Sequence, residues 1–253
     1  MQDQPLISVI TVCYNSAATL ERTLASVAAQ DWPSVEHIVI DGASTDGSAA
    51  ILERFHPRLA KLVSEPDQGI YDAMNKGLDH SSGEIVCFLN ADDQYVSNSV
   101  LSQVATLMHD HQLDALMGDV GFFHESNPQR MVRRYRSKHF TPGRLAWGWM
   151  PAHPALFLSR AVVERVGRFK TDYRIAGDYE FIVRAFHGHE VRYRHLPEVL
   201  VNMQTGGAST GGFGAKLRLN REVLRACREN GLQTNILKIL SKYPAKILEL
   251  LRR

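Results

Sequence analysis

The first apolar run of the chain, Leu6 to Tyr14, is rich in β-branched and apolar side chains without clean alternation of polar positions. Such a run is typical of a strand that is covered on both faces, as in a parallel sheet. The helical spacing of the apolar residues that follow predicts a helix from Thr19. The next apolar run, Val35 to Ile40, completes a βαβ unit.

The same alternation continues to about residue 110. Its pattern predicts a helix over 48–55, a strand over 59–64, a helix over 70–78 and a strand over 84–89. Short strands that alternate with helices imply right-handed crossovers and a doubly wound sheet. The predicted fold class is therefore α/β, with a Rossmann-like, mostly parallel central sheet flanked by helices.

The second half of the chain is less regular. We expect strands over 113–120 and 131–135, a loop-rich segment over 142–154, a helix from about Gly177 and a strand over 198–203. A glycine-rich loop over 206–212 precedes two helices, over 215–230 and from 235 to the end.

Composition narrows the class of protein. The 253 residues are 44% apolar and 22% charged with a formal net charge of +2, which favours a soluble globular protein and argues against bulk nucleic-acid binding. The three cysteines are unevenly spaced, so neither a disulfide framework nor a cysteine metal site is predicted, and a reducing cytosol fits best. No run approaches the roughly 18 apolar residues of a membrane span, and Met1 to Pro5 carries no export signal, so we expect neither export nor a spanning helix.

Carboxylates stand where the predicted strands run out: Asp41, Asp67, Asp92 and Asp93. In an open α/β sheet, ligands bind in the crevice beyond the carboxyl ends of the strands. A hard cation takes only one or two protein oxygens when a diphosphate supplies the others, so adjacent acids suit a metal-bound phosphate ligand. A plain turn is the alternative, although it does not explain why so apolar a strand ends on two mutually repelling acids.

Two other polar segments admit two interpretations each. Asp41 precedes a glycine and is assigned to a base or ribose, whereas Asp46 is assigned to the turn and the cap of the next helix. After Asp67, the side chains of Asn75 and Lys76 share one helix face with Asp72, and Lys76 is a candidate for a phosphate contact. The alternatives are a solvated helix face for Asp72 and Asn75 and a helix cap for Asp67.

Four ordered motifs carry a resemblance to a known family. They are Ser8-Val-Ile-Thr-Val-Cys-Tyr-Asn15, Val39-Ile-Asp-Gly-Ala-Ser-Thr-Asp-Gly47, Asp67-Gln-Gly-Ile-Tyr-Asp-Ala-Met-Asn-Lys-Gly77 and Leu89-Asn-Ala-Asp-Asp93. Together they resemble family 2 glycosyltransferases, most closely over residues 6 to 95. The resemblance implies a GT-A fold with a C-terminal helical extension, and a nucleoside-diphosphate-sugar donor.

The resemblance also implies roles for individual residues. Asp41 corresponds to the acid that contacts the nucleoside base, Asp67 to a second nucleoside-side acid and Asp92 to the last carboxylate of the DxD-type motif that holds Mn²⁺ or Mg²⁺. Asn90 stands at the first acidic position of that motif, where a neutral ligand weakens the hold on the ion. Asp93 is assigned to the metal or to orienting the sugar.

The segment Ile175 to Arg184 resembles the part of the family in which an acid that begins a helix is the catalytic base. Asp178 is the candidate, because the attacking acceptor hydroxyl must lose its proton to a group within hydrogen-bond reach. An ordinary helix N-cap is the alternative. Glu180 is a fallback base on another side of the helix, and Arg184 is interpreted as a structural partner.

Two further features concern the acceptor side. His153, between two prolines that restrict the backbone, is a candidate for contact with the donor phosphates or the acceptor, and Trp147 and Trp149 either stack on a sugar or pack in the core. The tail from Leu232 spaces apolar residues helically with basic residues largely elsewhere, which predicts a basic amphipathic helix bent at Pro244. This helix lies either on an anionic inner leaflet, which we favour, or against its own domain.

These features together predict a cytosol-facing, metal-dependent inverting glycosyltransferase, of the hexosyltransferase type, peripheral on the inner face of the membrane. Residues 1–110 would form the nucleotide-sugar half, 111–212 the acceptor and catalytic-base half and 213–253 the C-terminal helices. The resemblance to exopolysaccharide, colanic-acid-type and O-antigen assembly enzymes implies a glycan acceptor linked to undecaprenyl diphosphate. The alternatives are an inactive nucleotide-sugar binding module in an assembly complex and a sugar nucleotidyltransferase, which lacks support because residues 14–19 contain no glycine.

Overall fold

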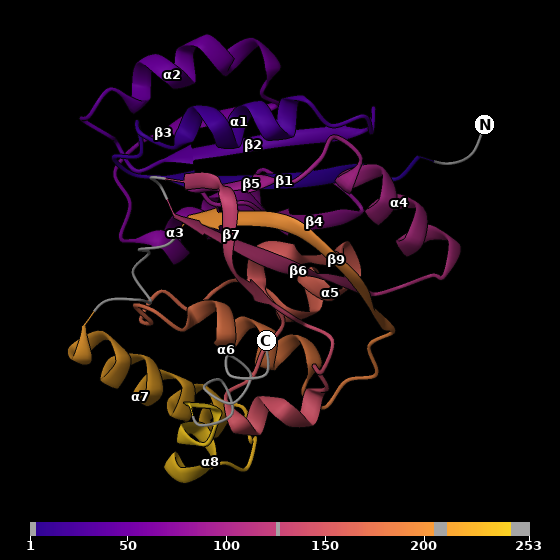
Figure 1. Ribbon diagram of the computed structural model, residues 1–253, viewed down its shortest axis with the longest axis vertical. Helices are drawn as coiled ribbons and strands as arrows, with labels where there is room; N and C mark the ends of the chain where they lie inside the picture. Colours follow the sequence, from indigo (N-terminus) through magenta and orange to yellow (C-terminus); the bar gives the residue numbers. More distant parts are fainter. Residues whose placement is uncertain (1–3, 125–126, 205–211, 244–253) are drawn as a thin grey trace.

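The predicted strands of the first half form one side of a single sheet. The computed structural model describes residues 4–124, 127–204 and 212–243. The elements of the first half are β1 Ile7–Cys13, α1 Leu20–Ala28, β2 Val35–Asp41, α2 Ser48–Phe55, the 3₁₀ turn His56–Arg58, β3 Lys61–Ser64, α3 Ile70–Asp79 and β4 Ile85–Phe88. Strands β3, β2, β1 and β4 lie side by side in that order and are all parallel (Figure 1).

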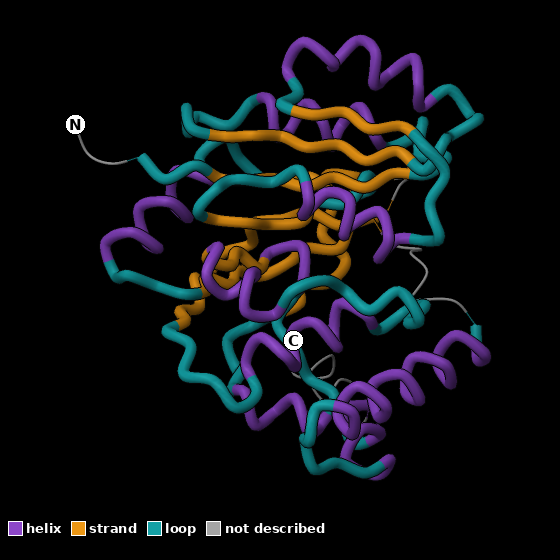
Figure 2. Tube along the Cα trace, turned by 180° about the vertical axis from the view of Figure 1, so that it is seen from behind, coloured by secondary structure: helices purple, strands orange, loops and turns teal. Residues whose placement is uncertain are grey.

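The second half extends the same sheet. Its elements are β5 Asp93–Tyr95, α4 Val100–Asp110, β6 Ala115–His124, β7 Asn127–Tyr135, η2 Pro142–Trp147, η3 His153–Ala155, β8 Leu156–Ser159, α5 Arg160–Val166, α6 Gly177–Phe186, β9 Tyr193–Gln204, α7 Phe213–Glu229 and α8 Ile236–Leu240. Beyond β4 the strand order is β8, β6, β9 and β5, and β7 pairs with β6. Figure 2 shows the strands as a central layer with helices on either side.

The strand β8 departs from the expected doubly wound pattern. It runs antiparallel to both β4 and β6, whereas β6 and β9 are parallel. Helices α4 and α5 and strand β5 were not individually predicted, and β9 is longer than the predicted strand over 198–203. Proline, which donates no backbone hydrogen bond, stands inside β9 at Pro197, where the pairing with β6 shifts register between Met117 and Asp119.

The lack of alternation in β1 has a direct structural cause. Ile10 and Val12 face one apolar cluster that includes residues of α3, α5 and α6, whereas Val9 faces a second cluster built largely with α4. Cys13 belongs to a third cluster with α1 and α2. Each buried aliphatic side chain of this kind contributes about 1.5–3 kcal/mol, and the first cluster spans both halves of the chain.

A glycine sets how closely α3 approaches the sheet. A Cβ atom added at Gly77 would lie 2.3 Å from the Ile10 side chain, so only glycine allows α3 to pack against β1 at this distance. The N-terminal end of α3, and with it the loop that carries Asp67, is thereby held at the carboxyl edge of the parallel strands.

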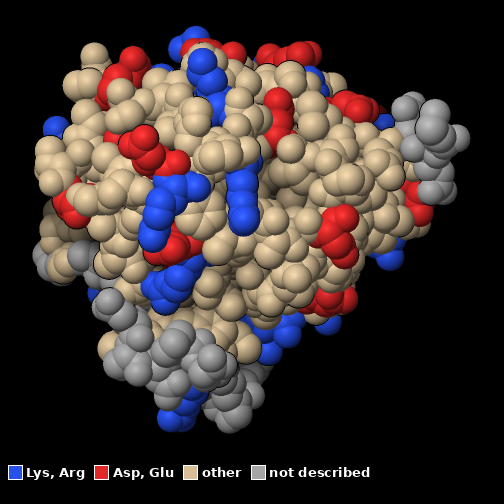
Figure 3. All heavy atoms as spheres, turned by 90° about the horizontal axis from the view of Figure 1, so that it is seen from above, with Lys and Arg blue, Asp and Glu red and all other residues tan. Residues whose placement is uncertain are grey.

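The C-terminal helices lie at the end of the molecule opposite α2 (Figure 1). Helix α8 docks on α7 and η2 through Ile239, which is fully buried. The predicted bend at Pro244 and the rest of the tail lie outside the described residues. Within the described residues, no helix is both long and apolar enough to cross a membrane. On the face seen in Figure 3, basic and acidic side chains are interspersed.

Candidate functional site

Asp41 closes β2 and fixes the turn that follows it. Its side chain is fully buried, and its oxygens accept hydrogen bonds from the backbone N–H of Ser44 at 3.1 Å and from the Ser64 hydroxyl at 2.7 Å. The thiol of Cys13 lies 3.5 Å away, and burial raises the pKa of that thiol. Asp41 thus joins the ends of three parallel strands, and its contact with a base stays a prediction.

The loops after β1 and β2 are fastened to each other. The Asn15 side chain accepts a hydrogen bond from the backbone of Thr45, and Asp46 accepts the N–H groups of Ala17 and Ser48. The assignment of Asp46 to the turn is therefore confirmed. The role of Asn15, whose φ of 48° places it in the left-handed region, was not foreseen from the sequence.

Asp67 lies directly over the Asp41–Gly42 turn. One of its oxygens accepts the N–H of Gly69 at 2.8 Å, and the other would be 2.4 Å from a Cβ added at Gly42. The same Cβ would lie 3.3 Å from the ring of Tyr14, whose side chain is 64% exposed. The structure therefore brings the two predicted nucleoside-side acids together beside an exposed aromatic ring.

The segment after β4 contains buried side-chain oxygen atoms that accept no hydrogen bond within the described residues. Asp93 is 1% exposed, and within the described residues neither of its carboxylate oxygens has a hydrogen-bond partner; the same holds for the side-chain oxygen of Asn90. Burial, followed by the nearby charge of Asp92, raises the pKa of Asp93 well above its usual range. Asp92 is exposed to solvent, although partial desolvation raises its pKa as well.

This donor set fits a divalent cation that completes its coordination with ligand oxygens. Unpaired acceptor oxygens and adjacent carboxyl groups gain from a positive charge, and hard cations prefer oxygen ligands. The described residues hold no cluster of three or more His, Cys, Asp or Glu side chains suited to a metal. A cation here would therefore depend on a few protein oxygens and on a bound phosphate group.

A hollow beside Asp92 adds residues that the sequence did not single out. It is lined from α1, β5, the β6–β7 hairpin and β9 by Thr19, Arg22, Thr23, Asp92, Asp93, Gln94, Phe123, His124, Asn202, Met203 and Gln204. Arg22 donates a hydrogen bond to Gln204 across it. No local motif marks these positions, because only the return of β9 beside β5 places them next to Asp92.

Asp178 stands in the first turn of α6. The N-cap position is Ala176, so the N-cap alternative for Asp178 is not what the structure shows. Burial, assisted by the charge of Glu222, raises the pKa of Asp178 to about 6, while a hydrogen bond from the Tyr179 N–H acts in the opposite direction. A carboxylate with this pKa is a better base near neutral pH than one with the ordinary value near 4.

Helix α3 contacts the start of α6, next to Asp178, through the ring of Tyr71. A Cβ added at Gly177 would lie 2.6 Å from the Tyr71 ring, so the ring packs directly against the start of α6. Burial and the charge of Asp178 both raise the pKa of Tyr71. The segment with Asp67 and the segment with Asp178, far apart in the sequence, therefore meet at one place.

Four predicted substrate residues have partners within the protein instead. The Asn75 amide exchanges two hydrogen bonds with the backbone of Phe169, at 2.9 and 2.8 Å. The Lys76 ammonium group contacts the Pro66 carbonyl at 2.9 Å and Glu65 at 2.8 Å. These two side chains brace the α3 region in this structure, and their contact with substrate stays a prediction.

His153 and Glu180 also have partners within the protein. The His153 ring is 8% exposed and stacks on Phe88 with a centroid distance of 5.4 Å, and burial lowers the pKa of His153 to about 4, so it is neutral at pH 7. Glu180 is fully buried and pairs with Arg184 at 2.8 Å and Lys170 at 3.0 Å. These partners favour a structural role for Glu180 over that of a base, and the structural assignment of Arg184 is confirmed.

Comparison with known proteins identifies the family. The model of glycosyl transferase family 2 matches residues 8–167, more than half of the chain, and the chain belongs to this family. It is 36% identical over 190 residues to an uncharacterized glycosyltransferase of Mycobacterium tuberculosis, covering 73% of this chain and 70% of that protein. It is 32% identical over 211 residues to a PGL/p-HBAD biosynthesis glycosyltransferase of Mycobacterium bovis, covering 81% and 79%. The protein is thus a family 2 glycosyltransferase. These two relatives are mycobacterial glycosyltransferases and are not specifically of the exopolysaccharide or colanic-acid type.

Solved structures agree on the fold. Residues 1–349 of TarS from S. aureus superpose with a TM-score of 0.70 at 22% identity, covering 93% of this chain and 70% of that one. A mannosyltransferase from Pyrobaculum calidifontis, solved with GDP-Man and Mn²⁺, gives a TM-score of 0.66 at 24% identity, covering 90% and 64%. The chain spans 39% of the length of the full TarS chain. The predicted GT-A type α/β fold with C-terminal helices is confirmed.

Proposed function

We propose that the protein moves a sugar, with inversion, from a nucleoside-diphosphate-sugar to a hydroxyl of a glycan acceptor. The observation that carries this proposal is the Asp178 carboxyl at the start of α6, with its raised pKa, joined through Tyr71 to the segment that bears Asp67. A base and a nucleotide-side crevice at one place are what a direct displacement needs.

Each group of site residues has a separate role in the proposed reaction. Tyr14, Asp41 and Asp67 bind the nucleoside beyond the ends of β1 and β2. Asp92, with Asn90, would hold Mn²⁺ or Mg²⁺, and the ion would stabilise negative charge on the diphosphate. The acceptor oxygen bonds to the anomeric carbon while the bond from that carbon to the diphosphate oxygen breaks. Asp178 takes the proton of the acceptor hydroxyl in the same step.

Support for the donor class comes from the fold neighbours. One TarS structure is a complex with UDP-GlcNAc, with a TM-score of 0.69, and the mannosyltransferase was solved with GDP-Man. We propose uridine or guanosine diphosphate as the nucleotide of this chain. The finer assignment to cell-surface polysaccharide assembly, with an acceptor on undecaprenyl diphosphate, is part of the same proposal.

A panel of nucleoside diphosphates and their sugars tests the donor site. One nucleotide at about 100 times its Kd, with Mn²⁺, is expected to raise Tm by about 5 °C or more, because selective binding to the folded state stabilises it by about 2.7 kcal/mol. Release of the same nucleoside diphosphate from its sugar, with an acceptor present, is then measured. Stabilisation without turnover for every donor and acceptor would favour the inactive binding module, for which the neutral Asn90 is the supporting observation.

We also propose that the protein binds the inner leaflet through its C-terminal helices. Three apolar residues on one side of α8 remain exposed after the helix has docked: Ile236, Leu237 and Leu240. The exposed Trp147 lies beside them, with the Lys238 ammonium group 5.5 Å from its ring centroid. On α7, within the described residues, no acid pairs with the exposed side chains of Lys216, Arg218, Arg221 and Arg228. Apolar side chains beside unpaired cations suit an anionic bilayer surface.

Vesicle flotation tests this surface. Arg218→Gln with Arg221→Gln is expected to weaken binding to anionic vesicles about 30-fold, since each basic residue near such a surface contributes about 1 kcal/mol. Leu237→Ser should weaken it further, whereas Val96→Ser, an exposed apolar residue after β5, should change nothing. Equal binding of all variants, or equal binding to zwitterionic vesicles, would contradict the proposal.

A further inference from the structure

The loop before α6 is held by a carboxylate from another helix. Glu222 of α7 accepts three consecutive backbone N–H groups, those of Arg174 at 3.1 Å and of Ile175 and Ala176 at 2.8 Å each. Helix α6 has no side-chain cap of its own. Hydrogen bonds from N–H groups to an ionised carboxylate are stronger than neutral ones, and negative charge is favoured at a helix N-terminus.

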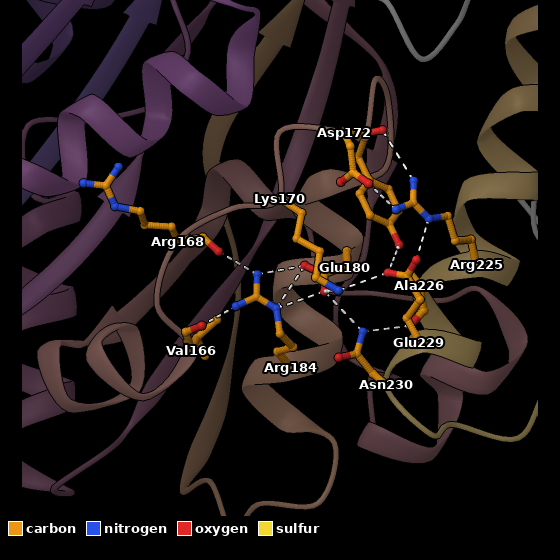
Figure 4. A network of polar contacts seen from close by, with 11 residues as sticks. Val166, Arg168, Lys170, Asp172, Glu180, Arg184, Arg225, Ala226, Glu229 and Asn230 are labelled. Atoms are coloured by element: carbon orange, nitrogen blue, oxygen red, sulfur yellow. Dashed lines mark hydrogen bonds and ion pairs between the residues drawn. The ribbon is translucent and has the colours of Figure 1, made fainter.

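Helix α7 is itself fixed in place by a second group of contacts (Figure 4). Glu229 and Glu180 share the ammonium group of Lys170, each at 3.0 Å, and Asn230 donates to Glu180 at 3.2 Å. Arg225 pairs with Glu229 and Asp172. These contacts fix α7 against α6, and they thereby hold Glu222 beside the loop that it binds.

The first turn of α6 is therefore held from two sides. Tyr71 of α3 packs on Gly177, and Glu222 of α7 binds the three residues that precede it. Asp178 follows at once, so its placement depends on a turn whose N–H groups are anchored outside α6. Within the described residues, the hydrogen bonds of Glu222 go to the loop before α6 and not to the predicted nucleotide crevice.

We propose that Glu222 is the positioning residue that sets the orientation of Asp178 in the transfer reaction. This inference rests on the proposed function, in which Asp178 is the base. The charge of Glu222 has a second effect, because it adds to burial in raising the pKa of Asp178. Among the described residues, Glu222 from α7 and Tyr71 from α3 are the titratable groups that face Asp178 from the elements packed against it.

Glu222→Gln tests the proposal. Glutamine keeps the size of the side chain but replaces one acceptor oxygen with an NH₂ donor, so the three N–H groups lose their shared anion. We expect kcat to fall about 10- to 100-fold, as for a misplaced catalytic group, with the donor KM within about twofold of wild type. The acid limb of the plot of kcat against pH should move to lower pH. Removing the negative charge of Glu222 lowers the pKa of Asp178, so the base stays ionised at a lower pH.

The matched control is Glu229→Gln, the same change on the same helix. Glu229 supports the α6–α7 contact but touches none of residues 174–176. This variant is expected to lower Tm while leaving the acid limb unchanged. An unchanged kcat and pH profile in Glu222→Gln, or an equal shift of the limb in both variants, would overturn the proposal.

Two readouts do not require turnover and so separate this inference from the proposed function. The amides of Ile175 and Ala176 should exchange with solvent at least about tenfold faster in Glu222→Gln, since they lose charge-assisted bonds. The Asp178 carboxyl, followed by ¹³C NMR, should titrate near pH 6 in wild type and lower in the variant. If both hold in a protein that transfers no sugar, the proposed function fails alone; if neither changes, Glu222 does not position Asp178.

Discussion

Asp178→Asn is expected to lower kcat by about 1,000-fold and to stabilise the folded protein at the same time. The loss of rate follows because an amide cannot take the acceptor proton, and a general base contributes about 10²–10⁴ in rate. The amide oxygen can still accept the Tyr179 N–H, so the helix start is retained.

The gain in stability follows from the sign of the pKa shift. The pKa of Asp178 is about 6 in the folded protein, above its ordinary value of 3.8, so the folded state binds more protons between these values. Stability is therefore lost as pH rises through this window, and above it the ionised group costs on the order of 2 kcal/mol, with an allowance for partial exposure. Asparagine removes that cost.

The measurement compares Tm and kcat at pH 8 with Tm at pH 4. Asp178→Asn should raise Tm by several degrees at pH 8 and by much less at pH 4, where the wild-type carboxyl is already protonated when folded. Full transfer activity in the variant would assign the base elsewhere. A lower Tm at pH 8 would show that the carboxylate is stabilised by contacts other than those described.

Asp92→Ala is expected to remove turnover and the effect of Mn²⁺ on nucleotide binding together. Asp92 is the exposed carboxylate beside the unpaired oxygens of Asn90 and Asp93. Its loss leaves Asp93, which is buried, as the single carboxyl group of this segment. A fall in kcat of about 1,000-fold or more corresponds to losing about 4 kcal/mol of charge stabilisation.

Calorimetry of the nucleoside diphosphate with and without Mn²⁺ checks this expectation. In wild type the ion should strengthen binding, and in Asp92→Ala the two titrations should coincide. Asp110→Ala, an exposed acid at the end of α4, serves as the control and should behave as wild type. Intact turnover in Asp92→Ala, or no heat for any such nucleotide in wild type, would contradict the metal site.

The acids at the strand ends were accessible to sequence reasoning for a physical reason. A buried parallel strand needs an apolar run, and the residue after that run must lie at the edge of the sheet where ligands bind. Asp41 is the last residue of β2, and Asp92 follows β4 after Leu89, Asn90 and Ala91. The role proposed for Asp178 came from the family resemblance, because an Asp at the start of a helix is more commonly a helix cap.

The roles of the other polar residues depend on contacts that spacing does not encode. His153 stands in a loop between two prolines, yet its ring is buried against Phe88 and Phe169. Lys76 lies on a polar helix face, yet its ammonium group forms an ion pair with Glu65. Glu222 looks like any acid of a charged helix, and its three N–H partners lie 46 to 48 residues away in the sequence.

The sequence alone determined the α/β class, the order of the first strands and helices and the acids at the carboxyl edge, because each depends on local periodicity and on where an apolar run stops. Tertiary structure alone decided the antiparallel insertion of β8, the pairing of β9 with β5 beside Asp92 and the anchoring of Asp178 by Tyr71 and Glu222. These depend on pairs of segments distant in the chain, and burial between such segments sets both the partners and the pKa of each polar side chain.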